Sequence, residues 1–315
     1  MNDEPTIHDA IMIGAGPSAL AAAIYTTRED IETVLYEKAV VGGMAAITDM
    51  VDNYPGFPEG VEGMTLAAQL EAQAKRFGAV IKYGEVSDIQ DNGETKTVIV
   101  DGKPVQARTV LIATGSDYNK IGVPGEAEYY GRGVHYCATC DGAFYRDKHI
   151  AVIGGGNSAV QEALFLTRFA SKIDMFVRSS IKASEVLQHE LAEFVEQGKI
   201  EVHLDTSTDE ILAPEGKVNG VRVTHDGVQR TVDVDGVFVF VGLSPNTEFL
   251  QHTSIELDEQ RLVKTDDKLM TSMPGVFASG DVRSGATMQI ASAVGEGAAA
   301  ALSIREYLEN LKRSA

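Results

Sequence analysis

Two short segments of this sequence share one glycine pattern, and this repeat constrains the fold more than any other feature. The first segment runs from Ala10 to Tyr25 and the second from Ile150 to Phe165. In each, an apolar run of strand length precedes G-x-G-x-x-A and a helix-forming stretch. The first glycine permits a tight turn, and the second lets a pyrophosphate approach the backbone at the helix N-terminus. Two such matches predict two dinucleotide-binding units.

The end of the second strand in the first unit indicates which nucleotide binds there. Glu37 closes the run that begins at Thr33, and it lies 23 positions after Gly14. An acid at this place accepts hydrogen bonds from ribose hydroxyls. The first unit therefore suits an adenosine without a 2′-phosphate, as in FAD.

The second unit has a different residue at the corresponding place. The same count from Gly154 reaches Val177, and Arg178 and Lys182 follow it with two serines between them. Arginine and lysine can pair with a 2′-phosphate, arginine with the better bidentate geometry. This pattern favours NADPH over NADH, although a solvated basic loop after a strand is also consistent with it.

Two further apolar strands each end in a glycine turn, one at Thr109–Gly115 and one at Val237–Gly242. After the second, the sequence predicts a strand at Gly275–Asp281 and a long alanine-rich helix from about Ala291 to Leu311. We therefore expect an α/β fold with two Rossmann-like dinucleotide-binding domains, the second inserted into the first.

Cys137 and Cys140 are the only cysteines of the chain. Two thiols three positions apart can close a small disulfide ring, and a helix N-terminus would favour the reactive thiolate. The adjacent Asp141 suits a general acid–base role for the dithiol. Two ordinary reduced cysteines, or half of a metal site assisted by His135, are the alternatives. Because no second ligand cluster completes a tetrahedral site, we expect redox chemistry and no metal.

Composition excludes several other classes of protein. A formal net charge of −19 argues against nucleic-acid binding, because phosphate backbones require a basic face. The polar, acidic start of the sequence is unlike a signal peptide, and glycines and a proline interrupt the next apolar stretch. We therefore expect a cytoplasmic protein that does not enter a membrane.

The combined motifs resemble the low-molecular-weight thioredoxin reductases along essentially the whole chain. The order and spacing of the motifs, with CATCDG between the two glycine units, make the resemblance specific. The matching segments are Gly14-Ala-Gly-Pro-Ser, Asn53-Tyr-Pro-Gly-Phe-Pro-Glu-Gly, Ala113-Thr-Gly, Cys137-Ala-Thr-Cys-Asp-Gly, Gly154-Gly-Gly-Asn-Ser-Ala and Gly280-Asp281-Val.

This resemblance implies an FAD-binding domain at 1–116 and 246–315 and an inserted pyridine-nucleotide domain at 117–245 that carries the CxxC centre. It implies a homodimer in which a hydride passes from NADPH to the flavin and the reduced flavin opens the disulfide. By position, Cys140 faces the flavin, Cys137 attacks the disulfide of thioredoxin or a similar protein, and Asp141 handles the proton.

The resemblance also assigns binding residues. The residues carried over for FAD are Gly14, Gly16, Ser18, Glu37, Asn53, Thr114, Asp281 and Gln289. Those assigned to NADPH are Gly154, Gly156, Asn157, Ser158, Arg178 and Lys182. Ordinary turn chemistry is an alternative explanation for Asn53 and Asp281.

Two departures from the family pattern keep other electron partners open. The family usually has His-Arg-Arg and a further arginine where this chain has Val177-Arg-Ser-Ser-Ile-Lys182, and Tyr-Arg-Gln where it has Thr287-Met-Gln289. Relatives that accept electrons from ferredoxin, or that pass them from a dithiol to oxygen, share the fold. NADH, ferredoxin and oxygen therefore remain alternative electron partners. A non-catalytic flavin-binding or redox-sensing protein is a third hypothesis.

Overall fold

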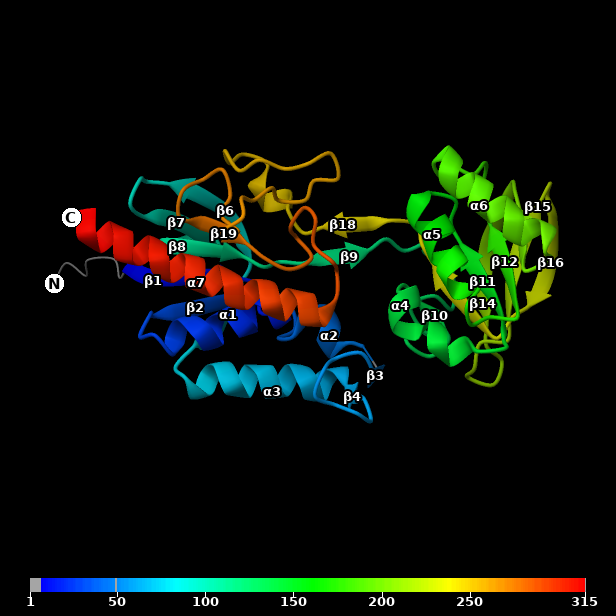
Figure 1. Ribbon diagram of the computed structural model, residues 1–315, viewed down its shortest axis with the longest axis horizontal. Helices are drawn as coiled ribbons and strands as arrows, with labels where there is room; N and C mark the ends of the chain where they lie inside the picture. The colour runs from blue at the N-terminus through cyan, green and yellow to red at the C-terminus, as the bar shows by residue number, and fades with distance from the viewer. Residues whose placement is uncertain (1–6, 49, 315) are drawn as a thin grey trace. The chain divides into compact units, whose positions relative to one another are not determined.

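The computed structural model describes residues 7–48 and 50–314, and it confirms the expected α/β class (Figure 1). The chain forms two compact units. Unit 1 comprises the segment up to Asp117 and the segment from Ser244 onward, and unit 2 comprises Tyr118–Leu243. The two connections between the units pair with each other as the short strands β9 (Ser116–Tyr118) and β18 (Leu243–Pro245).

Unit 1 is built on one mixed sheet in the order β5-β2-β1-β8-β7-β6, with β19 also paired to β8. The strands β5, β2, β1, β8 and β19 run parallel, whereas β7 and β6 form an antiparallel extension. The bounds are β1 Ile7–Ile13, β2 Thr33–Glu37, β5 Val80–Tyr83, β6 Val86–Asp91, β7 Lys96–Val100, β8 Lys103–Ile112 and β19 Val276–Ala278.

Helices α1 (Pro17–Thr27), α3 (Gly63–Arg76) and α7 (Ile290–Ser314) supply apolar side chains to one core of this unit. Helices α1 and α7 pack so closely that a Cβ on Gly297 would overlap the carbonyl oxygen of Ser18. The alanines of α1 are buried, and such close packing requires small residues where the two helices meet.

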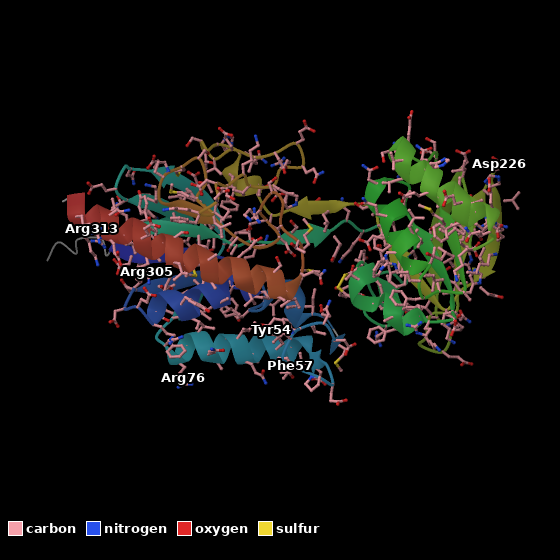
Figure 2. All side chains as sticks on the ribbon, viewed as in Figure 1. Tyr54, Phe57, Arg76, Asp226, Arg305 and Arg313 are labelled. Carbon is pink, nitrogen blue, oxygen red and sulfur yellow. A yellow bond between two sulfur atoms is a disulfide. The ribbon has the colours of Figure 1, made fainter. Side chains whose placement is uncertain are left out.

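Shorter elements complete unit 1. They are α2 Gly43–Ala46, the paired strands β3 Met50–Val51 and β4 Val61–Glu62, and the 3₁₀ turn η2 Glu248–Leu250. Between β3 and β4, the rings of Tyr54 and Phe57 lie with their centroids 6.1 Å apart (Figure 2). No helix in the described part of the chain is both long and apolar enough to cross a membrane.

Unit 2 contains a parallel sheet in the order β10-β17-β11-β12-β13 and a separate antiparallel sheet of β14, β15 and β16. The strand bounds are β10 Val134–His135, β11 His149–Ile153, β12 Lys172–Phe176, β13 Ile200–His203, β14 Thr206–Leu212, β15 Gly220–His225, β16 Val228–Asp233 and β17 Gly236–Val239. The helical elements are α4 Ala138–Asp141, η1 Gly142–Tyr145, α5 Asn157–Leu166 and α6 Glu185–Glu196.

A buried carboxylate ties together three strands of the parallel sheet in unit 2. The side chain of Asp174, on β12, is 3% exposed. Its two oxygens lie 2.6 Å from His149 Nε2 and 2.8 Å from His203 Nε2. Burial alone would raise the pKa of Asp174, but the hydrogen bonds from His203 and His149 and the charge of Lys172 outweigh burial and lower it.

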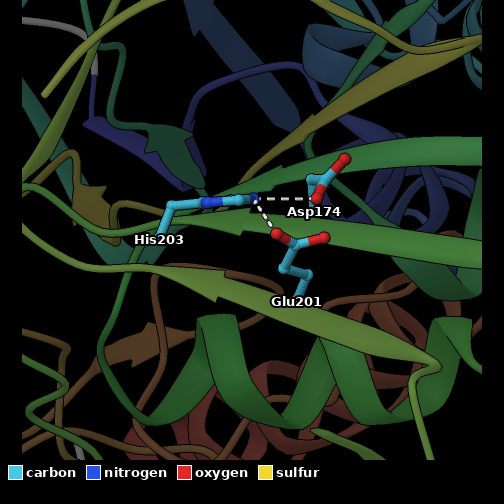
Figure 3. Close-up of side chains that lie close together, drawn as sticks. All are labelled: Asp174, Glu201 and His203. Atoms are coloured by element: carbon cyan, nitrogen blue, oxygen red, sulfur yellow. Dashed lines mark hydrogen bonds and ion pairs between the residues drawn. The ribbon is translucent and has the colours of Figure 1, made fainter.

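Glu201 lies beside this group, and atoms of Asp174, Glu201 and His203 are close enough together to share a metal ion (Figure 3). The donors and acceptors around His203 indicate a structural role and not metal binding. Arg230 donates to Nδ1 of His203 at 3.1 Å, which places the proton of a neutral ring on Nε2, facing the carboxylate. We therefore interpret the cluster as a structural ion-pair network.

We expect Asp174→Asn to lower the free energy of unfolding by about 3 kcal/mol at pH 7, because Lys172 and the two histidines lose the buried carboxylate that they contact. A carboxylate with a lowered folded-state pKa stabilises the fold above its unfolded-state pKa. This stabilisation is lost as the pH falls through the folded-state value. Urea unfolding should therefore show the difference between variant and parent shrinking below about pH 4.

Asp226→Asn is the matched control, because Asp226 is 84% exposed beside His225 (Figure 2). That change should alter the unfolding free energy by less than about 0.5 kcal/mol. A loss for Asp174→Asn that is the same at pH 7 and at acidic pH would contradict this account.

Candidate functional site

The first glycine turn joins β1 to α1 in unit 1. Gly14 has φ +95°, and a Cβ on it would lie 2.5 Å from the carbonyl oxygen of Ala113, which follows β8. The backbone conformation of Gly14 and the nearby carbonyl oxygen therefore exclude any side chain at this position. At Gly16, by contrast, a Cβ would meet no atom of the described residues within 4 Å. Glycine at this second position leaves the backbone open to close approach by a ligand, as a pyrophosphate requires.

The second glycine turn, between β11 and α5 in unit 2, repeats this division of roles. Gly154 has φ +140°, and a Cβ on it would overlap the carbonyl oxygen of Phe240 beyond β17. A Cβ on Gly156 would meet nothing within 4 Å among the described residues. The residues present thus fit one dinucleotide at each turn, with the N-termini of α1 and α5 toward the phosphates.

A cavity of about 440 Å³ in unit 1 brings together Gly14, Glu37 and Thr114 from three separate strand ends. Glu37 is buried, and its two carboxylate oxygens accept hydrogen bonds from the backbone N–H groups of Ala15 and Ala39, each at 2.8 Å. The carboxylate is thereby fixed beside the glycine turn, where a ribose hydroxyl would reach its remaining acceptor positions.

The other residues predicted to bind FAD also lie in unit 1. The buried Ser18 hydroxyl lies 2.6 Å from that of Ser279. Asn53 Nδ2 donates to Gln289 Oε1 at 3.1 Å, which joins positions 236 residues apart.

Asp281 follows β19 and the turn at Gly280. Burial raises the pKa of Asp281 to about 6, and the charge of Glu296 adds to the rise. Asp281 is half-buried and forms no ion pair with a described residue, so a hydroxyl donor from a ligand would stabilise its charged form.

A second cavity, of about 670 Å³, lies in unit 2 and is lined by the whole second glycine turn together with Arg178 and Lys182. The backbone N–H of Lys182 donates to the carbonyl of Gly155 at 2.7 Å, which holds the basic loop against the turn. Both basic side chains are exposed to solvent. Of the other predicted residues, Ser158 lines the cavity, and Asn157 does so while its Oδ1 accepts from the N–H of Ser184.

Sequence reasoning missed several residues that line this second cavity. Lys120 comes from the segment after β9, and Thr206, Ser207 and Thr208 come from β14. The Thr208 hydroxyl is buried and has no hydrogen-bond partner among the described residues. The three β14 residues belong to no motif, because a strand of the separate antiparallel sheet brings them to the cavity.

The two cysteines form a disulfide at the start of α4, with their Cα atoms 5.3 Å apart. Cys137 is the N-cap residue in extended conformation, and its sulfur accepts a hydrogen bond from the N–H of Cys140 at 3.2 Å. The same backbone donor can stabilise a thiolate on Cys137 after reduction. Asp141 ends α4, and its Oδ2 lies 3.0 Å from Nδ1 of His135.

Comparison with known proteins identifies the family of the chain. The family model described as pyridine nucleotide-disulphide oxidoreductase matches residues 8–297. The chain is 40% identical to the thioredoxin reductase of Listeria monocytogenes, over 100% of this chain and 98% of the relative. It is also 40% identical to that of Bacillus subtilis, over 99% and 98%. The structure superposes on the thioredoxin reductase of Streptococcus pyogenes with a TM-score of 0.92 and 37% identity, covering 98% and 100% of the two chains.

The chain therefore belongs to the pyridine nucleotide-disulphide oxidoreductases, and to the low-molecular-weight thioredoxin reductases within that family. Membership implies FAD and a pyridine nucleotide as cofactors. It also implies an enzyme in which the CxxC pair is the redox-active disulfide.

A matched pair of variants tests the two roles within the first glycine turn. Gly14→Ala should lower the unfolding free energy of the flavin-free protein by roughly 3 kcal/mol, because the methyl group meets a carbonyl oxygen at positive φ. Gly16→Ala should leave that unfolding free energy unchanged but weaken FAD binding by about tenfold or more. Urea unfolding and FAD titration by fluorescence measure the two quantities. Parent-like FAD affinity in Gly16→Ala would contradict the assignment.

Proposed function

We propose that this chain is an FAD-dependent thioredoxin-disulfide reductase that receives electrons from NADPH and works as a homodimer in the cytoplasm. The observation that carries the proposal is the disulfide at the N-terminus of α4, in the same unit as a complete dinucleotide-binding turn. The names of the relatives support thioredoxin, or a similar small protein disulfide, as the partner. A reducing compartment suits a cysteine pair that must cycle between disulfide and dithiol.

The residues of unit 1 would hold FAD. Glu37 would bind a ribose hydroxyl, the turn at Gly14 and Gly16 would admit the pyrophosphate, and Asp281 would accept a hydrogen bond from a ribityl hydroxyl. Ser18, Asn53, Thr114 and Gln289 would complete the site. When bound, FAD would supply the chemistry that accepts a hydride from the nicotinamide and passes two electrons to the disulfide.

The residues of unit 2 would bind NADPH at the second turn. Gly154 and Gly156 would shape the turn for the pyrophosphate, with Asn157 and Ser158 in the first turn of α5. Arg178 and Lys182 would pair with the 2′-phosphate, in whose place NADH has an uncharged ribose hydroxyl. Because this loop has only one arginine, and the side chains of Arg178 and Lys182 are both exposed, we expect a modest preference for NADPH over NADH.

The reduced pair would act by two successive exchange steps. The Cys137 thiolate attacks one sulfur of the partner disulfide, the partner S–S bond breaks, and a mixed disulfide forms. Cys140 then attacks the Cys137 sulfur, restoring the intramolecular disulfide and releasing the partner dithiol. Two electrons and two protons leave with the partner, and Asp141 would take each thiol proton and return it to the departing sulfur.

One observation keeps a second donor in view. The loop after β12 has Ser179 where typical members have the second arginine of His-Arg-Arg, which suits NADH, or a donor that needs no phosphate recognition, such as ferredoxin. Oxygen is the remaining alternative, as an acceptor of electrons from the dithiol. These possibilities differ in which reagent changes the flavin spectrum.

Anaerobic titration followed through the flavin absorbance separates them. We expect NADPH at sub-millimolar concentration to bleach the flavin. Arg178→Ala should raise the NADPH concentration for half-reduction by roughly tenfold and leave the NADH titration unchanged. Arg313→Ala is the control for charge, because Arg313 is 76% exposed at the end of α7 (Figure 2).

Bleaching by dithionite but not by NADPH would show that the proposed donor is wrong. Reduction by NADH or by reduced ferredoxin would then identify the donor. Rapid oxygen consumption that depends on an added dithiol would instead favour the oxidase alternative.

A further inference from the structure

His135 lies two residues before Cys137, at the end of β10, and its side chain is only 6% exposed. The imidazole forms a cluster with the rings of Tyr145 and Phe238, with centroid separations of 5.2 and 5.1 Å, and those two rings also contact each other. Close packing in this cluster restricts the orientation of the ring, so its two nitrogens face defined partners.

One nitrogen of the ring faces Tyr145 and the other faces Asp141. His135 Nδ1 lies 3.0 Å from Asp141 Oδ2, and Nε2 lies 2.7 Å from the hydroxyl of Tyr145. Because an ionised carboxylate offers only acceptors, a carboxylate at this distance favours the tautomer that has the proton on Nδ1. In the neutral ring, Nε2 then accepts from Tyr145. Burial raises the pKa of Tyr145, and the charges of Asp141 and Asp235 add to this, so the hydroxyl keeps its proton.

The other acidic groups near this cluster have partners of their own. Asp235, before β17, accepts a hydrogen bond from the backbone N–H of His149 at 3.1 Å. Glu162, on α5, accepts one from the backbone N–H of Ala138, and burial raises its pKa despite this bond. Among the described residues, His135 Nδ1 is the cationic-type side-chain atom found within ion-pair distance of the Asp141 carboxylate.

We propose that His135 is a positioning residue for disulfide exchange. Its Nδ1–H holds the Asp141 carboxylate in place to take the proton of the attacking thiol and deliver it to the leaving sulfur. In each exchange, one S–S bond breaks, another forms at the attacking sulfur, and the thiol proton passes through Asp141 to the released thiolate. The inference rests on the proposed function, in which the dithiol reduces a protein disulfide.

The basicity of the leaving thiolate distinguishes this role from simple packing. An alkyl disulfide such as hydroxyethyl disulfide releases a basic thiolate, which benefits from protonation as it leaves. A nitrobenzoate disulfide releases a weakly basic aromatic thiolate, which leaves readily without a proton. Loss of proton delivery slows only the first reaction, whereas a distorted active site slows both.

Two amide substitutions separate the two nitrogens of the ring. In His135→Asn the amide lies near the Nδ1 position and can still donate to Asp141, whereas in His135→Gln it lies near the Nε2 position and cannot. The full-length protein would be reduced with a phosphine, desalted under argon and mixed with either disulfide. Free thiols would then be counted by maleimide labelling and intact mass.

We expect His135→Gln to react with hydroxyethyl disulfide about tenfold more slowly than the parent, and with the nitrobenzoate disulfide within about twofold of it. His135→Asn should stay within about threefold of the parent with both. In an Asp141→Asn background, His135→Gln should cause no further loss, because the residue through which it acts is already changed.

Equal slowing of both disulfides by Gln and Asn would overturn the inference, as would a Gln defect that persists in full beside Asp141→Asn. Parent-like rates for His135→Gln would overturn it too. These outcomes leave the proposed function intact. A reduced parent protein that reacts with neither disulfide would contradict the proposed function, and the inference with it.

Discussion

The contact between a carbonyl oxygen and a side-chain-free glycine sets the geometry of both units. Ala113 in unit 1 and Phe240 in unit 2 place a carbonyl oxygen where any Cβ on Gly14 or Gly154 would collide with it. In unit 1 the contact holds the end of β8 against the turn between β1 and α1. In unit 2 it holds the end of β17 against the turn between β11 and α5. The end of β2 is also bonded to the first turn, because the backbone N–H of Ala15, which follows Gly14, donates to Glu37.

The redox centre depends on local structure of a different kind. Cys137 caps a helix of only four residues, and the N–H of Cys140 bonds to its sulfur. The surrounding aromatic cluster keeps His135 beside Asp141. Unit 2 thus carries both the disulfide and the groups proposed to move its protons. The choice of electron donor, by comparison, depends on two exposed side chains of one loop, Arg178 and Lys182. A few substitutions in that loop would change the donor without altering the disulfide centre.

The sequence was most informative where short-range spacing determines structure. The glycine turns, the CxxC pair and the α/β class follow from spacings of a few residues, and the structure and the relatives confirm the fold class and the family. Contacts between distant positions could not be derived in this way. Asn53 and Gln289 were assigned by resemblance, one by one, and only the structure shows them bonded to each other. The residues of β14 that line the second cavity gave no signal, because strand pairing in another sheet brings them there. His135 was considered only as a ligand assisting a metal site half formed by the cysteines, whereas its Nε2 bonds to Tyr145 and its Nδ1 lies 3.0 Å from Asp141.

The central claim is that electrons leave this protein through Cys137 to a thioredoxin disulfide. The most direct measurement is covalent trapping with each cysteine replaced in turn. Cys140→Ser keeps the proposed attacking thiol and removes the one that resolves the mixed disulfide. Incubated with oxidised thioredoxin, this variant should accumulate a one-to-one mixed disulfide through Cys137, detected by intact mass, whereas Cys137→Ser should form little. A stable adduct through Cys140 instead, or no adduct with either variant, would contradict the account.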